Sequence, residues 1–225
     1  APSSSRGSAL LSVRDVSVRF GGIVALDGVS FDVFPGQIAG LIGPNGAGKT
    51  TLFNCLSRLY TPHSGDVQFE GQSILKRPRH DIPHIGIGRT FQNVALFDRM
   101  TVLDNVKVGC HSVSSTSFFE NALRLPKVKG EEERITKRAM ELIEFMDLLP
   151  FTTAMAGPLP FPIRKRVELA RALASSPKLL LLDEPAAGLN HDEIEVLKGQ
   201  IKRVRETQHV TVLLVEHHMS LVMSV

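Results

Sequence analysis

The sequence predicts an α/β fold in which a phosphate-loop core is accompanied by an antiparallel β region and an inserted helical subdomain. Three observations support this prediction. A glycine-rich segment at residues 43–50 lies between an apolar run and a helical pattern, which is the context of a phosphate-binding loop. Alternating apolar and polar residues before it are typical of half-buried strands. Unbroken apolar runs near the C-terminal end indicate central parallel strands.

The composition limits the class of protein. With 225 residues, 43% of them hydrophobic, the chain can bury one large core, so we expect a single domain over residues 9–225 after a flexible tail at residues 1–8. A net charge of +3, with mixed signs in the densest charged stretch, argues against nucleic-acid binding. Cys55 and Cys110 are too few for a disulfide scaffold, so we expect buried free thiols. No apolar run approaches the roughly 18 residues that span a bilayer.

The N-terminal half predicts strands followed by the phosphate loop. Apolar residues alternate with polar ones at residues 10–20, 29–33 and 66–69, which favours strands of an antiparallel region. The apolar run at residues 38–42 leads into the glycine-rich segment, and a helix is expected to follow through Thr51.

The middle of the chain predicts helices. Residues 102–108, 118–125 and 131–149 carry helical spacing with few strand signals. We therefore expect residues 93–163 to form an inserted helical subdomain. It ends near a cluster of three prolines, Pro158, Pro160 and Pro162.

The C-terminal part predicts alternating helices and strands. A helix at about residues 164–174 is followed by an apolar strand at residues 178–182, a second helix and a strand at residues 210–215. This order is typical of a parallel sheet. Asn190 is expected to cap the second helix, because two acidic residues follow in its first turn.

The glycine-rich segment predicts a nucleotide site. Glycines lack Cβ atoms, so backbone N–H groups can point at a phosphate, and the following helix adds partial positive charge. Lys49 would reach the β- and γ-phosphates, and the Thr50 hydroxyl would ligate Mg²⁺. The alternative, a structural glycine-rich turn, does not require Lys49 and Thr50 in this register. The nucleotide-binding residues are expected to be Gly43, Pro44, Asn45, Gly46, Ala47, Gly48, Lys49, Thr50 and Thr51.

Two carboxylates follow the apolar strand at residues 178–182. Asp183 is placed to meet Mg²⁺ as the second acidic element of a phosphate-loop ATPase. The adjacent Glu184 can polarise the water that attacks the γ-phosphate. Taken alone, an Asp-Glu pair at a strand end is equally explained by a solvated turn or a helix cap. The phosphate loop in the same chain favours the catalytic interpretation.

Two further polar residues are ambiguous from chemistry alone. His217 follows the strand at residues 210–215 and could hydrogen-bond the γ-phosphate or the attacking water; His218 is a neighbouring candidate. Gln92 follows Arg89-Thr90-Phe91, and an isolated glutamine of this kind is more often a surface or turn residue.

In their order along the chain, these segments resemble the ATPase subunits of ABC transporters. The resemblance covers almost the whole chain and includes the phosphate loop, Gln92, residues 164–173, Leu182-Asp183-Glu184-Pro185 and Glu216-His217. Three segments resemble the ATP-binding subunits of branched-chain amino-acid importers in particular. They are Arg89-Thr90-Phe91-Gln92-Asn93, Asp183-Glu184-Pro185-Ala186-Ala187-Gly188-Leu189-Asn190 and Glu216-His217-His218-Met219.

The resemblance implies a phosphate-loop ATPase core and roles for individual residues. Phe20 would stack on the adenine of ATP, its alternative being a strand-end core phenylalanine. Gln92 would touch Mg²⁺ and link the site to a membrane subunit. Glu184 would be the catalytic base and His217 the switch histidine. The metal site would then comprise Thr50, Gln92 and Asp183.

The resemblance also implies partners. A second ATPase subunit, identical or different, is expected, together with transmembrane permease subunits and, indirectly, a solute-binding protein; no nucleic-acid partner is expected. The chain would lie at the cytoplasmic face of the cell membrane and hydrolyse ATP with Mg²⁺ to power import of branched-chain or other hydrophobic amino acids. Two alternatives stay open. One is a soluble ABC-type ATPase acting on nucleic acid or ribosomes, and the other is a nucleotide-binding partner with little turnover.

The chain departs from the family pattern in two places. The family's Leu-Ser-Gly-Gly-Gln signature is replaced by Leu159-Pro160-Phe161-Pro162-Ile163, which lacks the serine hydroxyl and, at Pro162, a backbone N–H. Proline suits the first turn of a helix, so the fold tolerates this segment, whereas a nucleotide contact there would be impaired. Relatives continue further beyond the switch histidine, so we expect the end at Val225 to be a truncation.

Overall fold

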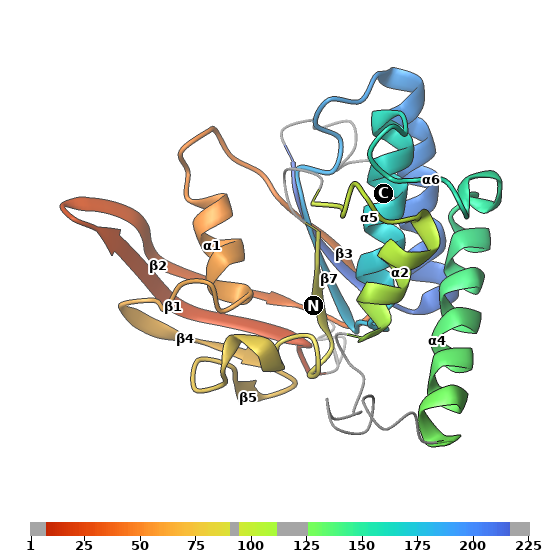
Figure 1. Ribbon diagram of the computed structural model, residues 1–225. Coiled ribbons are helices and arrows are strands. Elements are labelled where there is room, and N and C mark those ends of the chain that lie inside the picture. The colour runs from red at the N-terminus through yellow and green to blue at the C-terminus, as the bar shows by residue number, and fades with distance from the viewer. Residues whose placement is uncertain (1–7, 91–94, 112–125, 217–225) are drawn as a thin grey trace, which may run out of the picture. The chain divides into compact units, whose positions relative to one another are not determined.

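The computed structural model describes residues 8–90, 95–111 and 126–216, which belong to two compact units (Figure 1). The first unit comprises residues 1–92 and 178–225, and the second comprises residues 93–177. Two four-stranded sheets lie in the first unit, one antiparallel and one parallel. The second unit is mainly helical. The predicted α/β fold class, with its antiparallel region and helical insertion, is confirmed.

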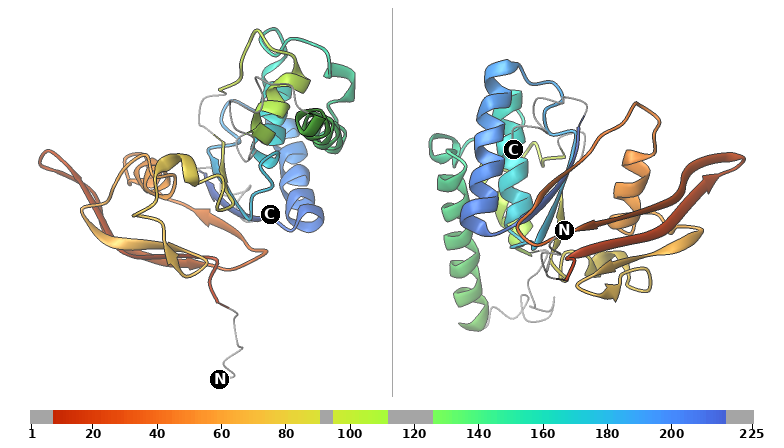
Figure 2. Two further views of the ribbon diagram at one scale, coloured as in Figure 1. Left: turned by 60° about the horizontal axis from the view of Figure 1, so that its bottom comes forward. Right: turned by 180° about the vertical axis from the view of Figure 1, so that it is seen from behind.

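The antiparallel sheet has the strand order β2-β1-β4-β5. Along β1, Leu11, Val13, Val16 and Val18 are buried, and a β-bulge between Val13 and Val16, where Asp15 takes a φ of 49°, keeps them on one face. β1 and β2 form a long hairpin (Figure 2). The strands are β1 (Leu11–Phe20), β2 (Ile23–Val33), β4 (Ser64–Phe69) and β5 (Gln72–Ser73).

The second sheet has the order β3-β8-β7-β6, and each neighbouring pair is parallel. Every residue of β7 and β8 is buried, as the unbroken apolar runs predict. Since the strands are parallel, their carboxyl ends meet at one edge. The elements are β3 (Ile38–Leu41), α1 (Lys49–Leu56), a 3₁₀ turn η1 (Arg79–Asp81), β6 (Ile87–Arg89), β7 (Leu179–Asp183), α6 (His191–Gln208) and β8 (Thr211–Val215).

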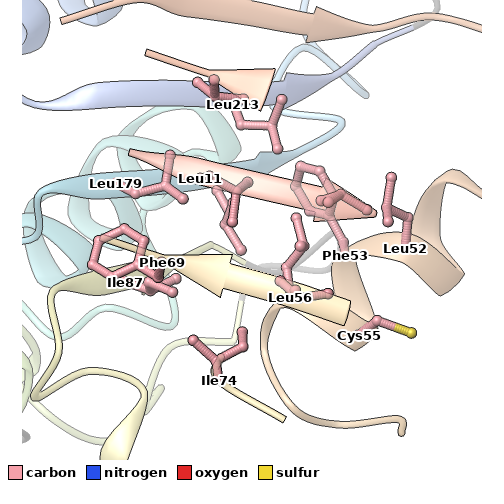
Figure 3. Close-up of a cluster of buried hydrophobic side chains, with 14 of the residues drawn as sticks. Leu11, Leu52, Phe53, Cys55, Leu56, Phe69, Ile74, Ile87, Leu179 and Leu213 are labelled. Atoms are coloured by element: carbon pink, nitrogen blue, oxygen red, sulfur yellow. The ribbon is translucent and has the colours of Figure 1, made fainter. Parts of the chain in front are cut away.

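One hydrophobic cluster joins α1 to both sheets of the first unit. Leu11 of β1, Phe53 of α1, Leu179 of β7 and Leu213 of β8 are all fully buried in it (Figure 3). Full burial of a Leu or Phe side chain contributes roughly 1.5–3 kcal/mol, so this cluster anchors the helix that follows the phosphate loop. Cys55 belongs to the same cluster, and burial raises the pKa of its thiol to about 11.

Helix α6 begins as predicted. The Asn190 side chain accepts a hydrogen bond from the Glu193 N–H at 3.0 Å, and the Glu193 carboxylate accepts one from the Asn190 N–H at 2.8 Å. This reciprocal pair is a capping box. The face of the helix that packs inward carries Ile194, Leu197, Ile201 and Val204.

The described part of the second unit contains three helices that pack on one another, with a 3₁₀ turn η2 (Leu149–Phe151). The helices are α2 (Val102–His111), α4 (Pro126–Phe145) and α5 (Phe161–Leu173). Helices α2 and α5 approach closely at Gly109, where a Cβ would lie 2.1 Å from the carbonyl oxygen of Arg171. Because α5 packs in this way, the unit extends to residue 177 rather than to the expected residue 163. Cys110 is buried here as a free thiol, as is Cys55 in the first unit, which confirms the expectation for both.

Several element boundaries differ from the sequence prediction, and two of the differences have a local cause in the backbone. β2 begins at Ile23 rather than at residue 29, because its first residues pair with the end of β1 although Gly28 interrupts the alternation. α4 ends at Phe145 rather than near residue 149, because Asp147 turns the chain with a φ of 57°. The helix expected at residues 118–125 lies outside the described residues. Among the helices of residues 8–90, 95–111 and 126–216, none is long and apolar enough to cross a membrane.

Candidate nucleotide-binding site

The glycine-rich segment forms the loop between β3 and α1, and its backbone requires glycine. Gly46 and Gly48 both have a φ of 82°. A Cβ at Gly48 would lie 2.2 Å from the carbonyl oxygen of Ala25 and 2.7 Å from the Leu26 side chain. Gly48 therefore lets the loop pass close to β2, and it begins α1 as the N-cap residue.

The start of α1 is suited to an anion. This helix, which lies wholly within the described part of the chain, has no side-chain cap and no acidic residue in its first turn, so its positive end stays available. The Lys49 ammonium donates hydrogen bonds to the carbonyl oxygens of Gly43 (2.7 Å) and Pro44 (2.8 Å). Thr50 is exposed and Thr51 is half-buried. The loop thus offers backbone N–H groups, a cation and hydroxyl groups, which are the groups that bind polyphosphate.

Asp183 at the end of β7 is buried, with 1% of its surface exposed. Arg89, the last residue of β6, donates from Nη2 to Asp183 Oδ2 at 2.9 Å. Nη1 of the same guanidinium donates to Asn54 Oδ1 (2.8 Å) and to Ser57 Oγ (3.0 Å), both at the C-terminal end of α1. One side chain therefore joins Asp183 to the helix of the phosphate loop. Sequence reasoning missed this contact, because Arg89 and Asp183 are 94 positions apart.

Glu184, directly after β7, is held by its main chain. Its φ of 48° lies in the left-handed region, which costs a residue with a side chain about 1–3 kcal/mol and is concentrated at functional sites. The Glu184 N–H donates to the carbonyl oxygen of Val215 at 3.0 Å, and its own carbonyl accepts from the Ala187 N–H at 3.1 Å. Its side chain is half-buried, so the carboxylate is presented from a fixed backbone position.

Glu216 supports the same segment and was not singled out as a site residue from the sequence. It follows β8, is 1% exposed, and its Oε1 accepts a hydrogen bond from the Ala186 N–H at 2.8 Å. The signal that could have found it is a carboxylate directly after a fully apolar strand, since such a group needs hydrogen bonds when it is buried. Glu216 thereby ties the end of β8 to the chain that follows Glu184.

Phe20 at the end of β1 is not a core residue. Its side chain is 45% exposed and makes an edge-on contact with the Tyr60 ring, with 5.3 Å between ring centroids. This exposure excludes the core alternative. An accessible aromatic ring can stack on a base, and Tyr60 is a second aromatic residue that sequence reasoning did not select.

The structure brings the phosphate loop and the two carboxylates to the same edge of the parallel sheet. Leu41, at the end of β3, pairs with Val215, and Val215 pairs with Asp183 on its other side. Two strand spacings amount to about 10 Å, which is the scale of a triphosphate with its metal ion. Gln92 and His217 lie outside the described residues; the strands that precede them, β6 and β8, end at this edge.

The segment 159–163 leads into α5. Pro160 is the N-cap residue without a side-chain cap, and Pro162 lies in the first turn. The Pro160 carbonyl accepts hydrogen bonds from the N–H groups of Ile163 and Arg164, both at 3.0 Å. The exposed Phe161 ring stands 5.4 Å from the Lys165 ammonium. The prolines are therefore compatible with the helix start, as predicted.

The residues at this edge fit Mg²⁺ that is shared with a nucleotide. The exposed Thr50 hydroxyl and the Asp183 carboxylate are hard oxygen donors, the type that Mg²⁺ prefers. Within residues 8–90, 95–111 and 126–216, however, no group of three His, Cys, Asp or Glu side chains could hold a metal alone. A Mg²⁺ ion bound here would need phosphate oxygens as further ligands, as is usual for this metal at nucleotide sites.

Comparison with known proteins identifies the family. The ABC transporter family model matches residues 26–187. The chain belongs to the ABC transporter family. The ABC cassette is 42% identical to the high-affinity branched-chain amino acid transport ATP-binding protein BraF of Pseudomonas aeruginosa, over 96% of this chain and 85% of BraF.

Solved structures agree with this assignment. The ADP conformation of MJ1267, an ATP-binding cassette of an ABC transporter, superposes with a TM-score of 0.82 at 31% identity, covering 96% of this chain and 84% of MJ1267. A dimeric, post-hydrolysis cassette MJ0796 with ADP and Pi gives a TM-score of 0.78 at 25% identity, covering 95% of this chain and 90% of MJ0796. The chain is therefore an ABC ATPase that binds ATP, as its phosphate loop predicts.

Proposed function

We propose that this ABC ATPase is the ATP-hydrolysing subunit of an importer for branched-chain or other hydrophobic amino acids. The observation that supports the solute class is the 42% identity with BraF over 96% of the chain. The observation that supports hydrolysis is the geometry of the sheet edge. Val215 of β8 pairs there with Asp183 on one side and, on the other, with Leu41, two residues before the phosphate loop.

The proposed reaction uses five residues of the described chain. The Lys49 ammonium would exchange its bonds to the Gly43 and Pro44 carbonyls for the β- and γ-phosphates of ATP. Thr50 and Asp183 would hold Mg²⁺ together with phosphate oxygens, and the ion supplies charge stabilisation for the leaving and transferring groups. Glu184 would orient the attacking water and accept its proton. Phe20 would stack on adenine, and Gln92 and His217 would complete the site by resemblance.

A second ATPase subunit is part of this proposal, because the dimeric MJ0796 structure carries ADP and Pi in a related cassette. The α5 segment of this chain offers Pro160 and Pro162 where the family has serine and glycine, and a proline nitrogen carries no hydrogen to donate. We therefore favour an unlike partner. In such a pair, the site built on Lys49 would face a regular signature and carry most of the turnover.

Transmembrane permease subunits are the proposed docking partners at the cytoplasmic face of the membrane. Among the described residues of the second unit, five large apolar side chains are exposed. Three of them are Phe97 (48%), Met100 (40%) and Met155 (51%). Met155 pairs with Thr101, the chain neighbour of Met100, in an isolated antiparallel β-bridge. The Phe97 backbone is fixed by the Asn105 side chain through two hydrogen bonds. Exposed apolar side chains on a hydrogen-bonded backbone suit a protein partner. With 48% of its surface exposed, Phe97 is not a core residue.

Reconstitution tests the proposal. The chain, its candidate partner ATPase and the co-purifying permease subunits are placed in liposomes, and phosphate release is measured with a solute-binding protein loaded with leucine or left empty. We expect the loaded binding protein to stimulate ATP hydrolysis several-fold. Stimulation by RNA or ribosomes in place of the permease would instead support the nucleic-acid alternative, and no turnover in any assembly would support a low-turnover partner.

A further inference from the structure

Arg89, the last residue of the short strand β6, contacts side chains of both β7 and α1 through its guanidinium group. Its side chain is 10% exposed. Nη2 meets Asp183, Nη1 meets both Asn54 and Ser57, and the guanidinium carbon stands 5.8 Å from the centre of the Phe53 ring. These contacts join β6, β7 and α1 at the edge where the nucleotide is expected.

Stability alone does not explain this arrangement. A buried ion pair gains little over well-packed apolar residues of similar volume, because desolvation offsets the attraction between the charges. The planar guanidinium does offer something that an apolar residue or a lysine cannot. It presents N–H groups in fixed directions, so that one side chain can hold two partners at a set separation.

The hydrogen bonds of Arg89 connect the two elements that carry the proposed metal ligands, β7 with Asp183 and α1 with Thr50. Asp183 would be one ligand of Mg²⁺, and Thr50 stands at the other end of α1 from Asn54 and Ser57, the residues that Arg89 holds. α1 comprises only residues Lys49–Leu56 and is anchored in the core through Phe53. A displacement of its C-terminal end would therefore move Thr50 with it.

We propose that Arg89 is a positioning residue that sets the separation between α1 and the Asp183 carboxylate, and through it the affinity for Mg²⁺ together with ATP. The inference rests on the proposed roles of Thr50 and Asp183 as metal ligands. It assigns no contact between Arg89 and the nucleotide, so binding of ATP without the metal should depend on Arg89 less than binding with Mg²⁺ does.

The test measures ATP affinity by calorimetry with Mg²⁺ and with EDTA, in the wild-type chain and in Arg89→Lys, which keeps the charge and loses the fork. We expect Mg²⁺ to strengthen ATP binding in the wild type and this gain to fall about tenfold in Arg89→Lys, with the EDTA affinity within about twofold. The matched control is Arg14→Lys, because Arg14 forms a comparable pair with Asp32 at 2.7 Å on the exposed antiparallel sheet; its Mg²⁺ gain should equal that of the wild type.

A second variant, Asn54→Ala with Ser57→Ala, leaves the Arg89–Asp183 pair intact and removes the hydrogen bonds between Arg89 and α1, together with the bond from Ser57 Oγ to the Phe53 carbonyl. We expect it to lose most of the same Mg²⁺ gain, and its effect should not add to that of Arg89→Lys, because both break one connection. An unchanged Mg²⁺ gain in both variants, additive effects, or an equal loss of affinity with and without Mg²⁺ would each overturn the inference. A wild-type chain with no Mg²⁺ gain would instead refute the proposed metal ligands.

Discussion

Gly48 offers the sharpest test of how the phosphate loop depends on close backbone approach. We consider Gly48→Ala, which adds a single methyl group where the φ is 82° and the carbonyl oxygen of Ala25 stands 2.2 Å from the new carbon. Normal contact between such atoms requires more than about 1 Å of additional separation. The loop and β2 must therefore move apart.

Two terms contribute to the expected loss of stability. A left-handed backbone costs an alanine about 1–2 kcal/mol relative to glycine, and forcing an extra carbon into a packed position costs about 1–3 kcal/mol more. Gly46 separates these terms, because it has the same φ of 82° but open space around its Cβ position. Gly46→Ala should carry the first cost alone, and Gly48→Ala should carry both.

The assay is chemical denaturation of the wild type, Gly46→Ala and Gly48→Ala, combined with a measurement of ATP turnover. Gly36→Ala serves as the activity control, because Gly36 has a φ of 71°, has open space around its Cβ position, and lies outside the phosphate loop. We expect turnover in Gly48→Ala to fall about 10²-fold, the typical effect of a 1 Å misplacement, and turnover in Gly36→Ala to persist. Equal stability losses for Gly46→Ala and Gly48→Ala would refute the steric argument.

Four further predictions concern single functions. Glu184→Gln should keep ATP affinity while turnover falls roughly 10²–10⁴-fold; wild-type phosphate release in the assembled complex would rule out the base. Lys49→Ala should weaken ATP binding or slow turnover strongly with unchanged circular dichroism, so wild-type affinity and turnover together would contradict its role. Phe97→Asp should leave the melting temperature nearly unchanged, because the side chain is 48% exposed, while co-purification with the permease is lost; full assembly would argue against docking there. The triple replacement Pro160→Ser, Phe161→Gly and Pro162→Gly restores the serine and glycines of the family signature at the start of α5 and should raise the low ATPase rate of the isolated chain. Each regained hydrogen-bond donor is worth up to about 2.7–4 kcal/mol. Robust wild-type activity without a gain in the triple variant would show that the prolines do not affect turnover.

The features that the sequence predicted are those encoded by neighbouring residues. The phosphate loop, the carboxylates after β7 and the cap at Asn190 each depend on a few consecutive side chains, and the structure contains the capping box and the predicted strand edge. Element ends were less accurate. A left-handed Asp147 ends α4 early, and nothing about an aspartate alone requires that conformation.

The contacts that the sequence analysis missed join residues far apart in the chain. Arg89 meets Asp183 across 94 positions, and the Ala186 N–H meets Glu216 across 30. Such pairs are brought together by the order of strands in the parallel sheet, with β8 between β3 and β7. Local pattern and propensity carry no information about that order, so these contacts required the structure.

The bonds that hold Glu184 have an implication for mutagenesis. Its N–H and carbonyl pair with Val215 and Ala187 through main-chain atoms alone, so replacing the side chains of those neighbours leaves both bonds in place. An alanine scan around the Glu184 carboxylate would therefore report tolerance at positions whose peptide groups hold it. An amide-to-ester replacement at residue 184, introduced by semisynthesis, deletes only the N–H donor and would measure how much of the turnover depends on the backbone.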